Sequence, residues 1–309
     1  MIRSLRPTDI LSVLAHGSPF SNYVRTGDCL GGERAPASLT LSLLGQFVYL
    51  RKLQYSWAWI EQNEIRGLLT IRQRSGPSAW EISGVYLDQR LEKIGFNLLD
   101  SLAMTTETLP ISRFFMRLPQ DSGLLETARQ TGFSLYASQR LYELSPRSRE
   151  LEKPITAGVS FRRKFPGDDF QQFQIYSRIV PERIRASEGM TFEEWRESRE
   201  RVLRGTSYFC EREGKAIGWV NFRKRCGKVC LEIVASEGDE PVLKEILSWA
   251  VAAAAPAPEI HCLVYAHQTR LCRLLEDRGF EAVKEHSLFA REQVVRVKEP
   301  YLVPAGLSS

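Results

Sequence analysis

The 309-residue sequence contains no apolar run that approaches the ~18 residues of a membrane-spanning helix. Its first residues, MIRSLRPTDI, have no apolar segment of the kind that directs secretion. Neither sign of charge dominates: residues 1–150 hold 17 basic and 14 acidic side chains, and the remainder holds 25 and 23. These absences predict a cytoplasmic protein with no membrane partner and no bulk attraction to nucleic acid. The short basic runs 162–164 and 223–225 leave a nucleic-acid or ribosome-associated role open as the weakest interpretation.

Histidine and cysteine are also scarce, with four and six residues. Cys226 and Cys230 flank a turn at Gly227, but no second pair of cysteines or histidines has the spacing of a zinc site. His261, His267 and His286 show no such spacing either. The sequence therefore predicts no metal, and cysteines that serve as small apolar side chains.

An internal repeat is the strongest signal in the sequence. The segment GLLTIRQRSGPSAWEI (67–82) aligns without a gap with GWVNFRKRCGKVCLEI (218–233), and six positions are identical. β-forming residues alternate with polar residues on either side of Gly76 and Gly227, which predicts two strands joined by a glycine turn in each copy. A repeat this long indicates a duplicated domain rather than an array of short repeats.

The same order of predicted elements surrounds both hairpins. Each copy has a strand before the hairpin and a helix after it, at 92–106 and 240–254. A further strand, a second helix that ends at a Gly-Phe pair, and a last apolar strand follow. The sequence therefore predicts two mixed α/β domains, 1–146 and 158–309, joined by a linker at 147–157. The linker lies within the run 144–158, which has two prolines and many charged residues.

This order of elements resembles the GNAT N-acetyltransferase superfamily, twice, over nearly the whole chain. A loop motif adds to the resemblance: the sequence RLEKIG (90–95) begins five residues after the apolar Val85 and precedes the leucine pair 98–99. The superfamily has R-x-x-G-x-G/A at this place. The resemblance implies two tandem acyl-CoA N-acyltransferase domains, each with a mixed, largely antiparallel sheet flanked by helices.

The resemblance also implies where acetyl-CoA, or another acyl-CoA, would bind in the first domain. Backbone amides of the loop, which includes Arg90, Lys93, Ile94 and Gly95, would hold the pyrophosphate at a helix N-terminus. The main chain near Val85 and Leu87 would pair with the pantetheine arm. Lys93 replaces a glycine of the motif, which costs about 1–2 kcal/mol if φ is positive, whereas its ammonium attracts a diphosphate with similar strength. An ordinary charged first turn of a helix remains the other interpretation of this loop.

One acidic residue is a candidate for the chemistry. Glu81 stands four residues before Val85, where several members of the superfamily have a glutamate that accepts the proton of the amine. Its flanking apolar residues, Trp80 and Ile82, could raise its pKa. A solvent-facing glutamate on a strand is the alternative. The tyrosine that usually protonates the leaving thiolate is absent, because Ala128 and Leu275 occupy the corresponding positions.

The second copy has a degenerate cofactor loop. The sequence EGDEPVLKEIL (237–247) contains no arginine, and carboxylates crowd the start of its helix, where they would repel a diphosphate. The segment 176–195 is where the helices that face the acceptor would lie. Two functions remain open: an acyl-CoA-dependent N-acetyltransferase acting on a small amine or a peptide amino group, and a non-catalytic GNAT-fold protein used for binding or assembly.

Overall fold

The computed structural model describes residues 1–9, 21–24, 53–62, 64–87, 91–107, 109–145, 158–201, 205–225 and 227–293. The predicted linker 147–157 and Arg90 lie outside the described residues. Within the ranges given, no helix combines the length and the apolar character that crossing a membrane requires.

The N-terminal half contains seven strands and three labelled helices among its described residues. They are β1 (Ile2–Ser4), β2 (Ser21–Val24), β3 (Gln54–Glu61), β4 (Glu64–Gln73), β5 (Ala79–Leu87), α3 (Leu91–Asp100), α4 (Leu102–Thr105), β6 (Arg113–Pro119), α5 (Leu125–Gln130) and β7 (Ser134–Leu144).

The C-terminal half has the same order of strands and helices from its hairpin onward, and its described residues before the hairpin include three α-helices. Its elements are β8 (Ser160–Arg163), η2 (Pro166–Asp168), α6 (Asp169–Ile179), α7 (Glu182–Glu188), α8 (Phe192–Ser198), β9 (Gly205–Arg212), β10 (Lys215–Arg225), β11 (Lys228–Ala235), α9 (Glu240–Ala254), β12 (Glu259–Tyr265), α10 (Thr269–Asp277) and β13 (Phe280–Glu292).

The two predicted hairpins are confirmed as β4–β5 and β10–β11, both antiparallel. The predicted helix at 240–254 is also confirmed, because α9 spans these residues. The helix predicted at 92–106 is instead two helices, α3 and α4, separated at Ser101. The hydroxyl of Ser101 donates a hydrogen bond to the carbonyl of Leu98, a local bond of the kind that competes with helical backbone pairing.

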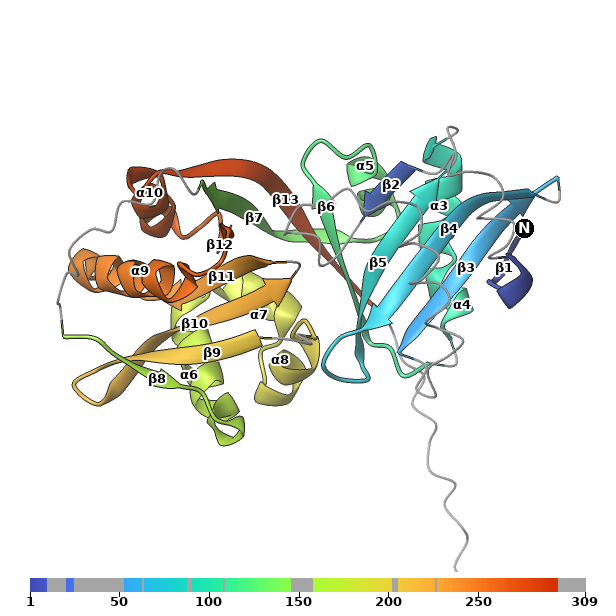
Figure 1. Cartoon of the computed structure of the whole chain (residues 1–309). Coiled ribbons are helices and arrows are strands. Elements are labelled where there is room, and N and C mark those ends of the chain that lie inside the picture. The colour runs from blue at the N-terminus through green and yellow to red at the C-terminus, as the bar shows by residue number, and fades with distance from the viewer. Residues whose placement is uncertain are drawn as a thin grey trace, which may run out of the picture.

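The last strand of each half lies in the sheet of the other half. One continuous 13-stranded sheet has the order β1-β3-β4-β5-β6-β13-β7-β12-β11-β10-β9-β8, and β2 pairs separately with β5. Strand β13 pairs with β6 of the N-terminal half, and β7 pairs with β12 of the C-terminal half. Figure 1 shows the long β7 and β13 side by side between the two halves. The exchange joins the halves through backbone hydrogen bonds.

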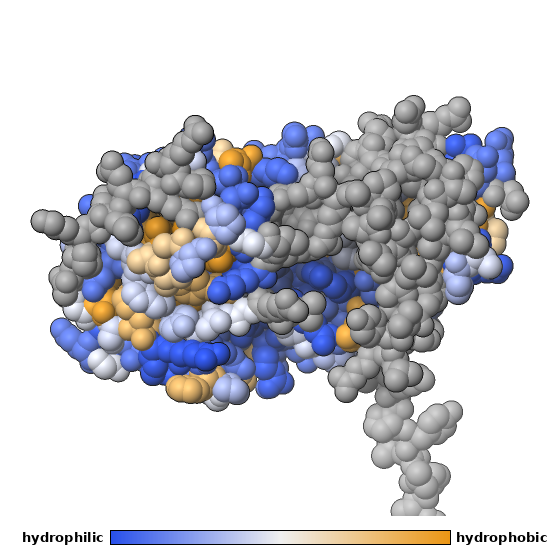
Figure 2. Space-filling model, in the orientation of Figure 1, coloured by the Kyte–Doolittle hydropathy of each residue, from blue (hydrophilic) through white to orange (hydrophobic). Residues whose placement is uncertain are grey.

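Helices cover both faces of this sheet. Helices α3 and α5 pack on one apolar cluster of the N-terminal half, and α9 and α10 pack on a second cluster in the C-terminal half. Helices α6, α7 and α8 cover a third cluster that includes residues of both halves, such as Phe115 and Trp219. Leu288 and Phe289, neighbours on β13, belong to the third and the first of these clusters. In the view of Figure 2, hydrophilic residues gather between the two halves.

Candidate functional site

The strand that was predicted to contact pantetheine already has a partner in the structure. Strands β5 and β6 pair only through three residues of each strand, and no longer pair beyond Glu81. Val85 and Leu87 lie beyond this point with buried side chains. Strand β2 pairs antiparallel with them, with Ser21 opposite Leu87 and Val24 opposite Val85. The predicted cofactor groove therefore has a segment of the same chain along its β5 edge.

In the described part of the predicted pyrophosphate loop, one side chain is exposed to solvent and the next is buried in the core. Lys93, in the first turn of α3, is exposed, whereas Ile94 packs in the N-terminal cluster. A Cβ atom on Gly95 would lie 2.9 Å from a methyl carbon of Leu124 and 3.3 Å from one of Leu87. The glycine thus allows α3 to pack closely in the core, a role that is independent of any ligand.

Glu81 is a buried partner of two arginines. Its side chain is 1% exposed. Its Oε1 accepts a hydrogen bond of 2.7 Å from Nε of Arg72, and its Oε2 lies 3.3 Å from Nε of Arg74. In the second copy Glu232 pairs in the same way with Arg223, at 2.8 Å. The arginine and the glutamate are both identical positions of the sequence repeat, and they lie on neighbouring strands of each hairpin.

The resemblance implies a tyrosine at two positions, and both are buried in the apolar clusters of the two halves. Ala128 on α5 and Leu275 on α10 are both completely buried. Tyr142, which is near the first of them in the chain, donates a hydrogen bond of 2.9 Å to Glu276. Tyr136 lies elsewhere, in the wall of the cavity described below.

Carboxylates occupy both helix starts beside the degenerate loop of the C-terminal half. Asp239 accepts a hydrogen bond from the backbone N–H of Val242 at the start of α9, and its other oxygen pairs with Arg212 at 2.6 Å. Glu237 accepts a hydrogen bond of 3.0 Å from the backbone N–H of Leu271 at the start of α10. The Arg212 guanidinium lowers the pKa of Asp239, with a further contribution from the Val242 amide. These helix ends are thus already satisfied by acidic side chains.

A cavity of about 200 Å³ lies between α6–α8 and the strands that they cover. Residues of strands β9 to β12 line it on the sheet side. Arg74, Arg117, Tyr136 and Gln139 reach it from the N-terminal half. The predicted acceptor-facing segment 176–195 contributes to this wall, although its three arginines, at 178, 183 and 185, do not. The cavity therefore borders both halves of the chain.

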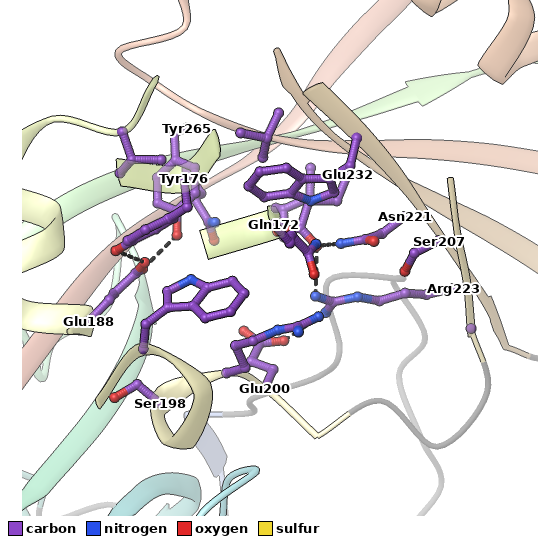
Figure 3. Close-up of a pocket in the computed structure, with 18 of the residues that line it drawn as sticks. Gln172, Tyr176, Glu188, Ser198, Glu200, Ser207, Asn221, Arg223, Glu232 and Tyr265 are labelled. Carbon is purple, nitrogen blue, oxygen red and sulfur yellow. Dashed lines mark hydrogen bonds and ion pairs between the residues drawn. The ribbon is translucent and has the colours of Figure 1, made fainter. Parts of the chain in front are cut away.

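One end of the cavity is formed by a glutamate and two tyrosines. Glu188, at the end of α7, accepts a hydrogen bond of 2.6 Å from the hydroxyl of Tyr265 and one of 3.1 Å from that of Tyr176. Figure 3 shows the three side chains pointing toward one another. Burial raises the pKa of Glu188, against the opposing effect of these hydrogen bonds and of Arg74. Burial also raises the pKa values of Tyr176 and Tyr265, so both hydroxyls remain donors.

The opposite end is an ion-pair network centred on Glu200. Its two oxygens accept hydrogen bonds from Arg117, at 2.6 Å, and Arg223, at 2.7 Å. Arg223 also binds Glu232, which accepts a further hydrogen bond of 3.1 Å from Asn221 (Figure 3). Burial by itself would raise the pKa of Glu200, but the surrounding arginines hold this pKa well below its usual value.

Three residues of the cavity wall were not predicted from the sequence: Glu188, Glu200 and Tyr265. They come from α7, from the residues after α8 and from the end of β12, and only the fold brings them together. Glu188 lies within the segment 176–195, which the resemblance implies would face the acceptor. This was the signal in the sequence that could have pointed to Glu188. Glu232 was identified from the repeat, as the counterpart of Glu81.

No protein-family model matches the sequence, and no curated protein is significantly similar to it in sequence. Solved structures are similar in fold. A tandem GNAT protein from the clavulanic acid biosynthesis pathway is 12% identical, with a TM-score of 0.54, over 94% of this chain and 98% of that chain. A GCN5-related N-acetyltransferase from Sphaerobacter thermophilus is 13% identical, with a TM-score of 0.55, over 94% of this chain and 95% of that chain. The chain has a tandem GNAT fold, as the sequence predicted.

Proposed function

We propose that the chain is an N-acyltransferase that transfers an acyl group from acetyl-CoA, or another acyl-CoA, to the amino group of a small molecule or a peptide. The observation that carries the proposal is the cavity beneath α6–α8, whose wall includes a carboxylate with a raised pKa, Glu188. An amine must lose its proton before it attacks a thioester, and a carboxylate with a raised pKa is a stronger base for this proton. The cavity is therefore the proposed acceptor site.

We place the acyl-CoA in the N-terminal half. There, the exposed Lys93 and the start of α3 provide positive charge. In the C-terminal half, Asp239 already occupies the start of α9, which is the counterpart of α3, and Glu237 occupies the start of α10. A bound acyl-CoA would supply the thioester carbonyl carbon that the amine attacks. The groove as described fits the pantetheine arm only if β2 gives up its pairing with Val85 and Leu87.

The position of Glu81 suits an indirect role. To accept a proton from an amine, this carboxylate would have to release Arg72 or Arg74. Arg74 lines the cavity and donates a hydrogen bond of 2.7 Å to the carbonyl of Ser198. We therefore propose Glu188 as the base and Glu81 as a positioning residue for Arg74. If Glu81 is the base, turnover lost in Glu81→Gln will recover at high pH, where the amine is already neutral, and the loss in Glu188→Gln will not recover.

A non-catalytic binding protein is the second candidate. The observation that favours it is β2, which uses the edge of β5 that a pantetheine arm would need. The buried Ala128 and Leu275, which replace a proton donor, point in the same direction.

The two functions are separated by calorimetric titration of CoA and acetyl-CoA, together with a thiol assay for amine-dependent release of CoA. Gly95 is unsuitable for the test because a larger residue there would disturb the core. We use Lys93→Glu instead, because this side chain is exposed. Lys215→Glu, at an exposed position at the start of β10 and far away in the sequence, is the matched control.

We expect CoA to bind the wild-type protein and the control equally, and to bind Lys93→Glu at least about threefold more weakly, a typical effect for one exposed charge. Asn22→Pro, which disrupts β2, should strengthen binding. If neither the wild-type protein nor Asn22→Pro binds CoA, the acyltransferase proposal fails and the non-catalytic function stands.

A further inference from the structure

The end of α8 is held by groups from the other half of the chain. The carbonyl of Glu197 accepts a hydrogen bond of 3.0 Å from the backbone N–H of Gly76. The carbonyl of Arg199 accepts one, also of 3.0 Å, from the backbone N–H of Ser75. Figure 1 shows α8 beside the turn between β4 and β5 that contains both donors. Because the last carbonyls of a helix have no partner within it, this β4–β5 turn (residues 74–78) caps α8 from outside.

Side chains add to this contact. The guanidinium of Arg74 donates a hydrogen bond of 2.7 Å to the carbonyl of Ser198, and it lies 3.9 Å from the centre of the Phe115 ring. The hydroxyl of Ser78 donates a hydrogen bond to the carboxylate of Glu197. Three consecutive carbonyls, at the end of α8 and directly after it, therefore accept hydrogen bonds from the N-terminal half.

The part of the chain that is held in this way is also part of the cavity wall. Four residues of α8 and of the segment after it line the cavity, namely Trp195, Ser198, Arg199 and Glu200. Figure 3 shows Ser198 and Glu200 in this part of the wall. Glu200 is bound from both halves, by Arg117 and by Arg223. The shape of this side of the cavity therefore depends on contacts with the N-terminal half.

Gly76 is the residue that allows so close an approach. Its φ is not among the positive values that favour glycine, so the backbone itself would accept a side chain there. A Cβ atom on Gly76, however, would overlap the side chain of Glu197 and would lie 2.7 Å from its Cδ atom. Any larger residue at position 76 would thus push the end of α8 away from the turn.

The equivalent glycine of the sequence repeat is explained differently. Gly227, at the turn between β10 and β11, has a φ of +80°, which is a conformation that favours glycine. Among the described residues beyond its chain neighbours, only Pro258 would lie within 4 Å of a Cβ atom there, at 3.8 Å. The two copies thus have a glycine at the same position for different physical reasons, and contact with a helix explains the one at Gly76.

We propose that the β4–β5 turn of the N-terminal half positions α8 and thereby shapes the acceptor cavity in the C-terminal half, with Arg74 and Gly76 as its positioning residues. The N-terminal half then has a role at the acceptor site that is independent of acyl-CoA binding. The inference rests on the proposed function in that it takes the cavity to be the acceptor site. The contacts themselves need no ligand, so the two proposals can fail separately.

Hydrogen exchange of the full-length protein under native conditions tests the proposal, because it reports the local opening of α8. In Gly76→Ala, the backbone amides of residues 195–198 should exchange at least about tenfold faster than in the wild-type protein, as overpacking at this contact predicts. Gly227→Ala is the matched control. It strains the backbone at the same position of the repeat without contacting α8, so exchange in α8 should change by less than about twofold. Thermal unfolding shows whether each variant is folded.

A second variant removes the steric overlap. Glu197→Gly deletes the three atoms that a Cβ atom on Gly76 would approach most closely. Adding Gly76→Ala to Glu197→Gly should therefore change the exchange of α8 by less than about twofold, since both substitutions act on one contact. If Gly76→Ala does not fold, the double variant should fold.

Three results would overturn the proposal. They are unchanged exchange of α8 in Gly76→Ala, equally fast exchange in Gly227→Ala, and an effect of Gly76→Ala that persists in the Glu197→Gly background. Each would show that the β4–β5 turn does not set the position of α8.

A measurement at the site separates positioning from a general loss of stability. Gly76→Ala should raise the KM for the amine at least about threefold and leave the affinity for CoA unchanged, whereas Gly227→Ala should change neither. Faster exchange of α8 in a protein that never releases CoA would retain the positioning role and reject the acyltransferase. Release of CoA with an amine whose KM Gly76→Ala does not change would retain the acyltransferase and reject the positioning of its acceptor site.

Discussion

The hydroxyl of Tyr265 donates a hydrogen bond of 2.6 Å to the carboxylate of Glu188, and this pair joins the end of β12 to the end of α7. The bond stabilises the ionised form of a carboxylate whose pKa burial raises. Both residues lie in the wall of the cavity, so the protonation state of this pair affects the charge of the wall.

The first prediction concerns the pH dependence of stability. Because the pKa of Glu188 is higher in the folded than in the unfolded protein, the folded state holds more protons between the two pKa values. The contribution of Glu188 to the free energy of unfolding therefore falls as the pH rises through this interval. Glu188→Gln cannot titrate, so it should gain on the order of 1 kcal/mol relative to the wild-type protein between pH 4 and pH 8. Urea unfolding at both pH values measures this, and a relative loss would contradict the assignment.

Glu200 should behave with the opposite sign. Its pKa in the folded protein is well below the usual value, so its contribution to stability is present above the pKa of the unfolded state and is lost as the pH falls toward the folded value. Glu200→Gln leaves Arg117 and Arg223 without their shared carboxylate, and we expect a loss of about 2 kcal/mol or more at pH 7.

The control for this change is Glu126→Gln. Its pair with Arg129 is exposed, with 67% and 53% of the two side chains accessible, and should contribute less than about 0.5 kcal/mol. If both variants lose a similar free energy of unfolding, the ion-pair network at Glu200 contributes no more to stability than an exposed ion pair.

A pair of glycine substitutions tests the packing of α3. Gly95→Ala would place a Cβ atom 2.9 Å from Leu124, so we expect a loss of about 1–3 kcal/mol from overpacking. Gly123→Ala meets no atom within 4 Å and should change the stability by less than about 0.5 kcal/mol. Thermal unfolding of the two variants makes the comparison. If Gly95→Ala does not change the stability, α3 can move away from the core to make room for the methyl group.

The exchange of β7 and β13 predicts the behaviour of a cut chain. A protease site inserted between residues 147 and 157 allows the two halves to be separated covalently after folding. They should still elute together in size-exclusion chromatography under native conditions, because β13 pairs with β6 and β7 pairs with β12. Separation without denaturant would show that these strands do not hold the halves together.

The sequence by itself determined the duplication and both hairpins, because local alternation, glycine turns and an ungapped repeat can all be read along the chain. The tandem GNAT architecture was implied by the resemblance of this order of elements to the superfamily. The pairing of Arg72 with Glu81, and of Arg223 with Glu232, was also implicit there, because a tight hairpin brings these positions onto neighbouring strands.

Only the tertiary structure decided which sheet each last strand joins and which side chains form the cavity. An alternating apolar pattern shows that a segment is a strand but does not specify which sheet edge it will pair with. Glu188, Glu200 and Tyr265 are separated by turns, helices and other strands. Their proximity comes from the packing of α6–α8 on a sheet shared by both halves.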